Sequence, residues 1–190
     1  MFCSRNRRSP RQVAGEHATR GDFQRIFSED MPGLHLLAYL LTADHQLAEQ
    51  VFVAGLDDSI HGNPVFRQWA RSWSQRAIVK RAIKAMAPSP KEPHNGATRM
   101  DPQTGNQELD DLARRMVNLS TFQRFVFVLS ILEGYSTMEC AALLSCSPAE
   151  VVAVKADALK AVAVFDREQA EMPQPLINSW KSLFPPAQLS

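Results

Sequence analysis

Apolar residues recur along the chain with the spacing of amphipathic helices. Phe23, Ile26 and Phe27 stand at i, i+3 and i+4, which places them on one face of a helix. Asp22 comes just before them and is expected to cap that helix. Convincing strand-like alternation is absent, and the short run Phe125–Leu129 lies inside a longer helical pattern. Further apolar stripes predict helices over residues 34–41, 47–54 and, after the break at Gly62-Asn63-Pro64, 65–86.

A second local pattern marks where helices begin in the second half of the chain. A serine followed three residues later by glutamate or glutamine can form a capping box, in which each side chain accepts a hydrogen bond from the other residue's backbone N–H. Such pairs occur at Ser120 with Gln123, Ser136 with Glu139, and Ser147 with Glu150. Helices are therefore predicted to begin near 121, 137 and 148. The short helix, three-residue turn and second helix predict a helix-turn-helix, although an ordinary three-helix bundle fits the same pattern.

A change in composition divides the chain. Residues 87–106 hold four prolines and two glycines among mostly polar residues, so this segment cannot supply a hydrophobic core and is interpreted as a linker. The predicted fold class is all-α: two small helical modules joined by this Pro/Gly-rich linker, the second being a helix-turn-helix. The expected organisation is a disordered basic arm over 1–20, a helical domain over 21–86, the linker over 87–106, a helix-turn-helix domain over 107–168 and a Pro-rich tail over 169–190.

Composition argues against several classes of protein. The chain has 190 residues, of which 45% are hydrophobic and 22% charged, and three cysteines; these values are ordinary for a globular protein and provide no disulfide framework. No apolar run reaches the ~20 residues that span a bilayer, so a cytoplasmic protein without a membrane segment is expected. The five histidines are scattered, and no metal-binding or catalytic motif is present. We therefore expect no enzymatic activity, no metal site and no cofactor.

Charge is distributed unevenly, although the formal net charge is only +1. Residues 21–60 have seven acids and one arginine, giving −6, whereas residues 61–86 have six cations and no acid, giving +6. Trp69 and Trp73 lie among these six cations. Because cations neutralise phosphates and aromatic rings stack on unpaired bases, the segment is a candidate for binding nucleic acid. For the two tryptophans a place in the core is the favoured alternative, and the acidic segment is an available partner for the cations.

Two blocks of sequence resemble the extracytoplasmic-function group of RNA polymerase sigma factors. The first block, Asp22 to Met86, includes LLAYLLTADHQLAEQVF, which resembles the helix pair that grips the polymerase clamp, and FRQWARSWSQRAIVKR, which resembles the helix that melts the promoter and reads its −10 element. The second block, Leu119 to Val162, includes LSTFQRFVFVLSILEGYSTMECAALLSCSPAEV, which is similar to the C-terminal helix-turn-helix that reads the −35 element. The blocks correspond to sigma region 2 and sigma region 4.

The resemblance implies a function, partners and site residues. It implies a transcription initiation protein that binds RNA polymerase core and promoter DNA, with an anti-sigma factor as a further partner. Polymerase binding is then expected from Leu47, Glu49, Gln50 and Asp57. DNA binding is expected from Arg67, Trp69, Arg71, Trp73, Arg76, Lys80, Arg81 and Lys84 in the first module, and from Ser147, Glu150 and Lys155 in the second.

The predicted recognition helix departs from the pattern of that family. Positions that usually hold lysine or arginine hold Val152, Val154 and Asp157, and the segment 148–165 has a net charge of 0. Because DNA affinity depends largely on neutralised phosphates, such a helix is a weak reader of DNA. The alternative function is therefore a degenerate sigma-like protein that has lost −35 reading and regulates transcription through protein–protein contacts. A two-domain scaffold unrelated to transcription is the third hypothesis.

Overall fold

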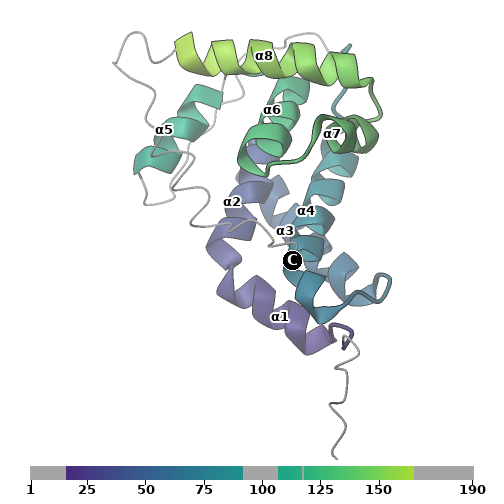
Figure 1. Ribbon diagram of the computed structural model, residues 1–190. Coiled ribbons are helices and arrows are strands. Elements are labelled where there is room, and N and C mark those ends of the chain that lie inside the picture. Colours follow the sequence, from purple (N-terminus) through teal and green to yellow (C-terminus); the bar gives the residue numbers. More distant parts are fainter. Residues whose placement is uncertain (1–15, 92–106, 117, 165–190) are drawn as a thin grey trace, which may run out of the picture.

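The fold is all-α, as the apolar pattern predicted. The computed structural model describes residues 16–91, 107–116 and 118–164 (Figure 1). Within these ranges there is no strand, only an isolated antiparallel bridge between His17 and Phe66. The short element η1 is a 3₁₀ helix, and η2 is a π-helical turn that continues α6. The elements are α1 (Arg20–Glu29), α2 (Met31–Thr42), α3 (His45–His61), η1 (Arg67–Trp69), α4 (Ala70–Met86), α5 (Gln107–Met116), α6 (Thr121–Phe127), η2 (Val128–Leu132), α7 (Thr137–Leu144) and α8 (Pro148–Val164).

Several segments interpreted from composition fall outside the described residues. These are most of the basic arm (1–15), most of the linker (92–106) and the Pro-rich tail, which lies within 165–190. The last residues of the arm are described. Glu16 to Thr19 run beside the segment that precedes η1 and lead directly into α1.

The predicted helix starts in the second half are confirmed, since α6, α7 and α8 begin at Thr121, Thr137 and Pro148. At the start of α7, the Ser136 N–H donates to the Glu139 carboxylate at 2.9 Å, and the Glu139 N–H donates to the Ser136 hydroxyl at 3.3 Å. Gly134 has φ +72° in the preceding loop, a left-handed conformation that glycine adopts without strain. Residues 145–147 connect α7 to α8 and complete a helix-turn-helix.

The start of α1 differs from the expectation. Thr19, not Asp22, is the N-cap residue, and its hydroxyl accepts a hydrogen bond from the Asp22 N–H at 3.3 Å. Asp22 lies inside the first turn, where its carboxylate accepts from the Thr19 N–H at 2.9 Å and closes a capping box. The apolar stripe begins only at Phe23, after the polar first turn of the helix, so the stripe placed the start of the helix too late.

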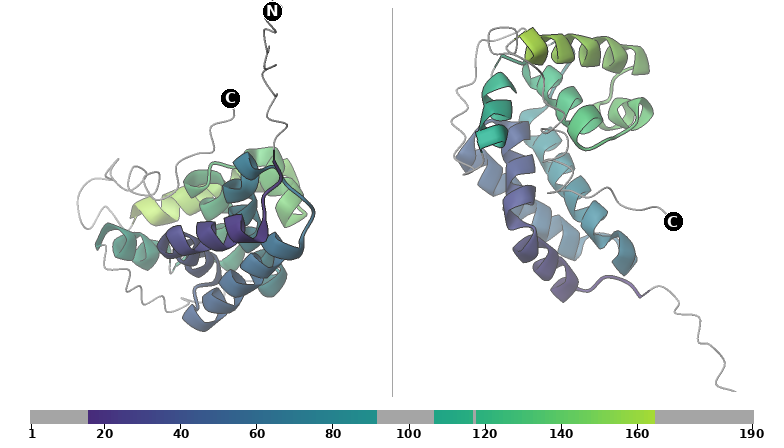
Figure 2. Two further views of the ribbon diagram at one scale, coloured as in Figure 1. Left: turned by 90° about the horizontal axis from the view of Figure 1, so that it is seen from below. Right: turned by 60° about the vertical axis from the view of Figure 1, so that its left-hand side comes forward.

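α2 lies within a continuous hydrophobic core. Its sequence is apolar around most of its circumference, so neighbours must cover all of its sides, and every residue from Leu36 to Thr42 is buried. α1, α3 and α4 pack against it, and α6 contacts it from the second half of the chain (Figures 1 and 2). The core continues through Phe125 and Leu129 to Cys140 of α7 and Val151 of α8. The two halves of the described chain therefore bury apolar surface against each other.

A buried arginine joins these halves. Arg124 of α6 is 1% exposed, and its Nε donates to the Leu41 carbonyl at 3.2 Å. Leu41 lies in the last turn of α2, where carbonyl groups have no partner within the helix and carry the partial negative charge of the helix dipole. The Arg124 guanidinium therefore stabilises the end of α2 at the place where α6 packs on it.

The described residues were examined for membrane-spanning helices, for clusters of metal ligands and for reactive cysteines. No single helix among them is both long and apolar enough to cross a membrane; α7 and α8, bent by 104°, meet that test of length and composition only as a pair. Nor do these residues bring together three or more histidine, cysteine, aspartate or glutamate side chains that could hold a metal ion. Cys140 is fully buried, and burial raises its pKa to about 11. It is a small apolar residue of the core.

Gly55→Ala is expected to destabilise the protein because α3 and α4 approach each other closely at this glycine. A Cβ at Gly55 would lie 2.8 Å from Cγ1 of Ile78 and 3.3 Å from its Cα. Overpacking costs about 1–3 kcal/mol, which exceeds the ~0.5–1 kcal/mol that alanine gains over glycine within a helix. Urea unfolding followed by circular dichroism measures the loss. Gly21→Ala is the control, because its Cβ would meet only the Thr19 hydroxyl at 3.8 Å; equal stability changes in both variants would contradict the prediction.

Candidate nucleic-acid interface

One face of η1 and α4 presents two aromatic rings and two cations in a row. Trp69, Trp73, Arg76 and Lys80 follow one another at spacings of four, three and four residues, so they share a face of the helix. Trp69 is 49% exposed, Trp73 and Arg76 are half-buried, and Lys80 is exposed. The Lys80 ammonium lies 5.7 Å from the centre of the Trp73 ring, within range of a cation–π interaction. We call these four residues the α4 track.

The favoured expectation for the tryptophans, a place in the core, is wrong for Trp69. About half of its surface remains exposed, and its ring packs edge-on against Phe66 with 5.2 Å between the ring centroids. Small side chains, Ala70, Ser74 and Ala77, occupy buried positions of α4. Because they let the neighbouring helices approach closely, the large rings lie at the edge of the packed surface. Trp69 is therefore accessible to a ligand, and the half-buried Trp73 is accessible in part.

The last three residues of the α4 track, Trp73, Arg76 and Lys80, line a pocket of about 390 Å³, a volume typical of sites for small organic groups. Two aromatic rings, two cations, one amide and one carboxylate meet there, and the carboxylate, that of Asp58, is paired with Arg81. Such groups can stack on a heterocyclic base, hydrogen-bond to its edge and neutralise the phosphate attached to it. The lining residues are Trp73, Arg76, Ala77 and Lys80 of α4, with Asp58 and His61 of α3 and Gly62 and Asn63 of the loop that follows.

Three of the six cationic residues expected to bind DNA form ion pairs with carboxylates. The acidic segment over 21–60 supplies most of these partners, so its charge acts within the molecule. Arg76, Lys80 and Lys84 form no ion pair with any residue in the described ranges. The held cations are Arg67, 3.2 Å from both Asp22 and Glu16, Arg71 with Asp30, and Arg81 with Asp58.

Asp22→Asn is expected to lower the melting temperature near neutral pH, with an effect that disappears in acid. The Asp22 carboxylate accepts hydrogen bonds from the backbone N–H and hydroxyl of Thr19 and from Arg67, and these contacts lower its pKa from 3.8 to about 2. Because the pKa is lower in the folded state, the ionised group stabilises the fold above about pH 4, and this contribution is lost as the pH falls towards 2. Thermal melts between pH 7 and 2 should show the two proteins converging; a constant difference would contradict the assignment.

The residues expected to bind polymerase lie on α3 in different environments. Glu49 and Gln50 are exposed, whereas Leu47 is half-buried and packs against the core. Asp57 is exposed and lies 2.9 Å from His61, with which it can form an ion pair. Glu49 and Gln50 are therefore the two of these residues that are most open to a protein partner.

The second expected DNA surface, at the start of α8, offers little positive charge. The Ser147 N–H and hydroxyl each donate to the Glu150 carboxylate at 2.8 Å, and these bonds lower the pKa of Glu150. Val152, one turn from the start of the helix, is 58% exposed, and Lys155 is half-buried. An ionised carboxylate and an apolar side chain at this end disfavour contact with DNA phosphates.

Three polar residues of the pocket were missed by the sequence analysis: Asp58, His61 and Asn63. They reach the pocket because α3 packs along α4, with Gly62 beside the Trp73 ring. The break at Gly62-Asn63-Pro64 had been recognised from the sequence. Two helices joined by a loop of only a few residues tend to pack as a helical hairpin. From this rule, the end of α3 could have been placed beside α4.

Comparisons with known proteins give one similar structure. No family model matches the chain, and no curated protein matches it. Among solved structures, the chain is similar to the sigma factor RpoE in complex with the anti-sigma factor NepR from Bartonella quintana. The sequence identity is 18% and the TM-score is 0.47, and the match covers 78% of this chain and 99% of that chain.

Proposed function

We propose that the chain is a sigma-factor-like transcription initiation protein that binds core RNA polymerase and promoter DNA. The observation that carries the proposal is the α4 track, in which Trp73, Arg76 and Lys80 line a pocket of about 390 Å³ and the exposed Trp69 precedes them along the same face. Bases within a duplex cover each other's faces, so only an unpaired base can stack on Trp73 or enter the pocket. The proposed DNA ligand is therefore the unpaired promoter strand.

In this function the protein captures a strand and carries out no covalent chemistry. Arg76 and Lys80 neutralise phosphates, while Trp69 and Trp73 stack on bases. Since these contacts form only with the unpaired strand, their free energy favours the open state of the promoter over the duplex. Core polymerase is proposed to contact the exposed side chains of Glu49 and Gln50 on α3.

The surface of α8 favours a second candidate function. Met138 of α7 is 67% exposed and Val152 of α8 is 58% exposed, and the Glu150 carboxylate stands at the start of α8. These groups suit a protein partner better than a phosphate backbone. The second candidate is a degenerate sigma-like protein that has lost −35 reading and regulates transcription through protein–protein contacts.

Binding of single-stranded DNA by the purified chain distinguishes the two candidates. Three basic side chains of α4, Arg76, Lys80 and Lys84, form no ion pair within the described residues, although the Arg76 charge lowers the pKa of Glu139. If all three contact phosphates, the logarithm of the binding constant should fall against the logarithm of salt concentration with a slope of about −2 for a single strand. Fluorescence anisotropy with a labelled oligonucleotide measures the slope. No binding at low salt would overturn the first candidate and leave the protein-binding one.

The polymerase contact is tested by recovery of core polymerase on the immobilised chain. The double variant Glu49→Lys, Gln50→Lys should recover less polymerase than the wild type, because it replaces one negative and one neutral side chain by two positive ones on an exposed face of α3. Glu29→Lys is the matched control, since Glu29 is an exposed acid on α1. Equal recovery by the wild type and both variants would remove Glu49 and Gln50 from the interface.

A further inference from the structure

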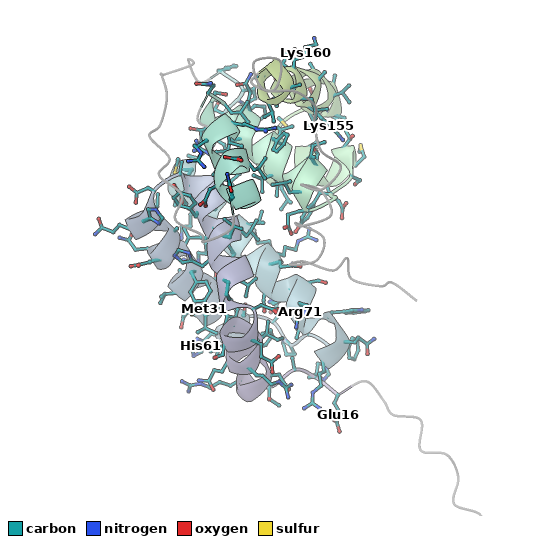
Figure 3. The ribbon with its side chains drawn as sticks, turned by 90° about the vertical axis from the view of Figure 1, so that its left-hand side faces the viewer. Glu16, Met31, His61, Arg71, Lys155 and Lys160 are labelled. Carbon is teal, nitrogen blue, oxygen red and sulfur yellow. The ribbon has the colours of Figure 1, made fainter. Side chains whose placement is uncertain are left out.

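The chain just before α1 is fastened to the segment that leads into η1. The Ala18 N–H donates to the Val65 carbonyl and the Arg67 N–H donates to the Glu16 carbonyl, both at 2.8 Å. These two hydrogen bonds form an antiparallel bridge that sets His17 opposite Phe66. Glu16 and this bridge lie at the end of the molecule remote from α8, where Lys155 and Lys160 mark the other end (Figure 3).

Three aromatic rings meet at this bridge. The rings of His17 and Phe66 are stacked, with centroids 5.1 Å apart and planes 22° apart, and the ring of Phe66 meets Trp69 edge-on at 5.2 Å and 77°. All three side chains are exposed: Phe66 is 36% and Trp69 49% exposed, and His17 is in the same class. Trp69 also belongs to the α4 track, so the rings of His17 and Phe66 extend that track beyond the start of η1.

We infer that His17, Phe66 and Trp69 form a base-stacking platform that binds further nucleotides of the single strand held by the α4 track. The inference rests on the proposed function. It assigns a DNA-binding role to His17 and Phe66, two residues that the proposed function does not use. Because His17 and Phe66 stack on each other, one face of each ring is covered, and bases are proposed to stack on their outer faces and on the exposed part of Trp69. The backbone bridge holds the platform together, so replacing a ring leaves its support in place.

The charges around the platform indicate which kind of contact it makes with the strand. The nearest cations on η1 and α4, Arg67 and Arg71, are paired with Asp22, Glu16 and Asp30, so they add little net positive charge. The platform therefore binds by stacking, whereas Arg76 and Lys80 bind by neutralising phosphates. These two contributions differ in their dependence on salt, because only phosphate neutralisation releases counterions.

The test measures affinity and salt slope together for a labelled single-stranded oligonucleotide. Phe66→Ala should weaken binding at least about fivefold, and His17→Ala should weaken it to a smaller extent, both with an unchanged salt slope. Phe66→Trp should retain the wild-type affinity, because it keeps a ring at the bridge. Circular dichroism confirms that each variant is folded.

Three outcomes separate the platform from the proposed function. Wild-type affinity in folded Phe66→Ala and His17→Ala, with weakened binding in Trp73→Ala, overturns the platform and leaves the function intact. If Phe66→Ala lowers both the affinity and the salt slope, the assignment of Phe66 to base stacking is overturned. Absence of single-strand binding by the wild type overturns the proposed function and the platform together.

Discussion

Trp73→Ala is expected to weaken binding of a single-stranded oligonucleotide at least about tenfold at low salt. The Trp73 ring lines the pocket and lies under the Lys80 ammonium at 5.7 Å from the ring centroid. Stacking of one base on an aromatic ring contributes ~1–3 kcal/mol to binding, and the middle of this range, ~2 kcal/mol, is roughly thirtyfold in affinity. Alanine removes this stacking surface. It also removes the cation–π contact that holds the Lys80 ammonium beside the ring, a contact that the free protein already makes. Fluorescence anisotropy titrations of the labelled oligonucleotide measure the effect.

Two further variants distinguish the ring from the charges beside it. Trp73→Phe should lose less affinity than Trp73→Ala, since a smaller ring still stacks. The double variant Arg76→Ala, Lys80→Ala should reduce the salt slope by about 1.4, because two phosphate contacts are lost. Lys160→Ala is the matched control: Lys160 is exposed on α8, at the opposite end of the molecule from the bridge at Glu16 (Figure 3). Wild-type binding by a folded Trp73→Ala protein would show that the α4 track does not bind the strand.

Arg124→Ala is expected to lower the free energy of unfolding by about 2–4 kcal/mol. The Arg124 side chain is 1% exposed and donates to the Leu41 carbonyl at the end of α2. Alanine leaves a buried carbonyl without this donor, at a cost of ~1–3 kcal/mol, and opens a cavity between α2 and α6 that adds to the loss. Urea unfolding followed by circular dichroism gives the difference from the wild type.

Arg124→Met separates the hydrogen bond from the packing. Methionine fills much of the volume of the arginine side chain but donates no hydrogen bond, so this variant should lose less stability than Arg124→Ala. The Leu41 carbonyl loses its donor in both variants, so the difference between them measures the packing of the side chain. If both variants retained wild-type stability, the contact between Arg124 and Leu41 would not stabilise the junction of α2 and α6.

The sequence predicted the starts of the helices in the second half to the residue. Ser136 with Glu139 and Ser147 with Glu150 form capping boxes in which every partner lies three residues away. Such contacts need no information from the rest of the chain. The prediction was wrong at α1, where Asp22 was expected to be the cap and Thr19 is the cap, because the apolar stripe begins only at Phe23, after the polar first turn of the helix.

The candidate site was predicted only in part. The order of rings and cations on α4 is a property of helical spacing, so Trp69, Trp73, Arg76 and Lys80 could be placed on one face from the sequence. The exposure of these side chains could not be predicted from the sequence, because it depends on which helices cover that face. Trp69 was expected in the core and is 49% exposed, since buried positions of α4 are filled by the smaller Ala70 and Ser74.

The sequence by itself determined that this chain is helical and where α6, α7 and α8 begin, because apolar periodicity and capping act over a few neighbouring residues. Only the tertiary structure decided which cations remain open to a ligand. Arg67 pairs with Asp22 across 45 residues of sequence, and Arg81 pairs with Asp58 across 23. Ion pairs form between side chains that folding brings within a few ångströms, and neither composition nor local spacing contains those distances.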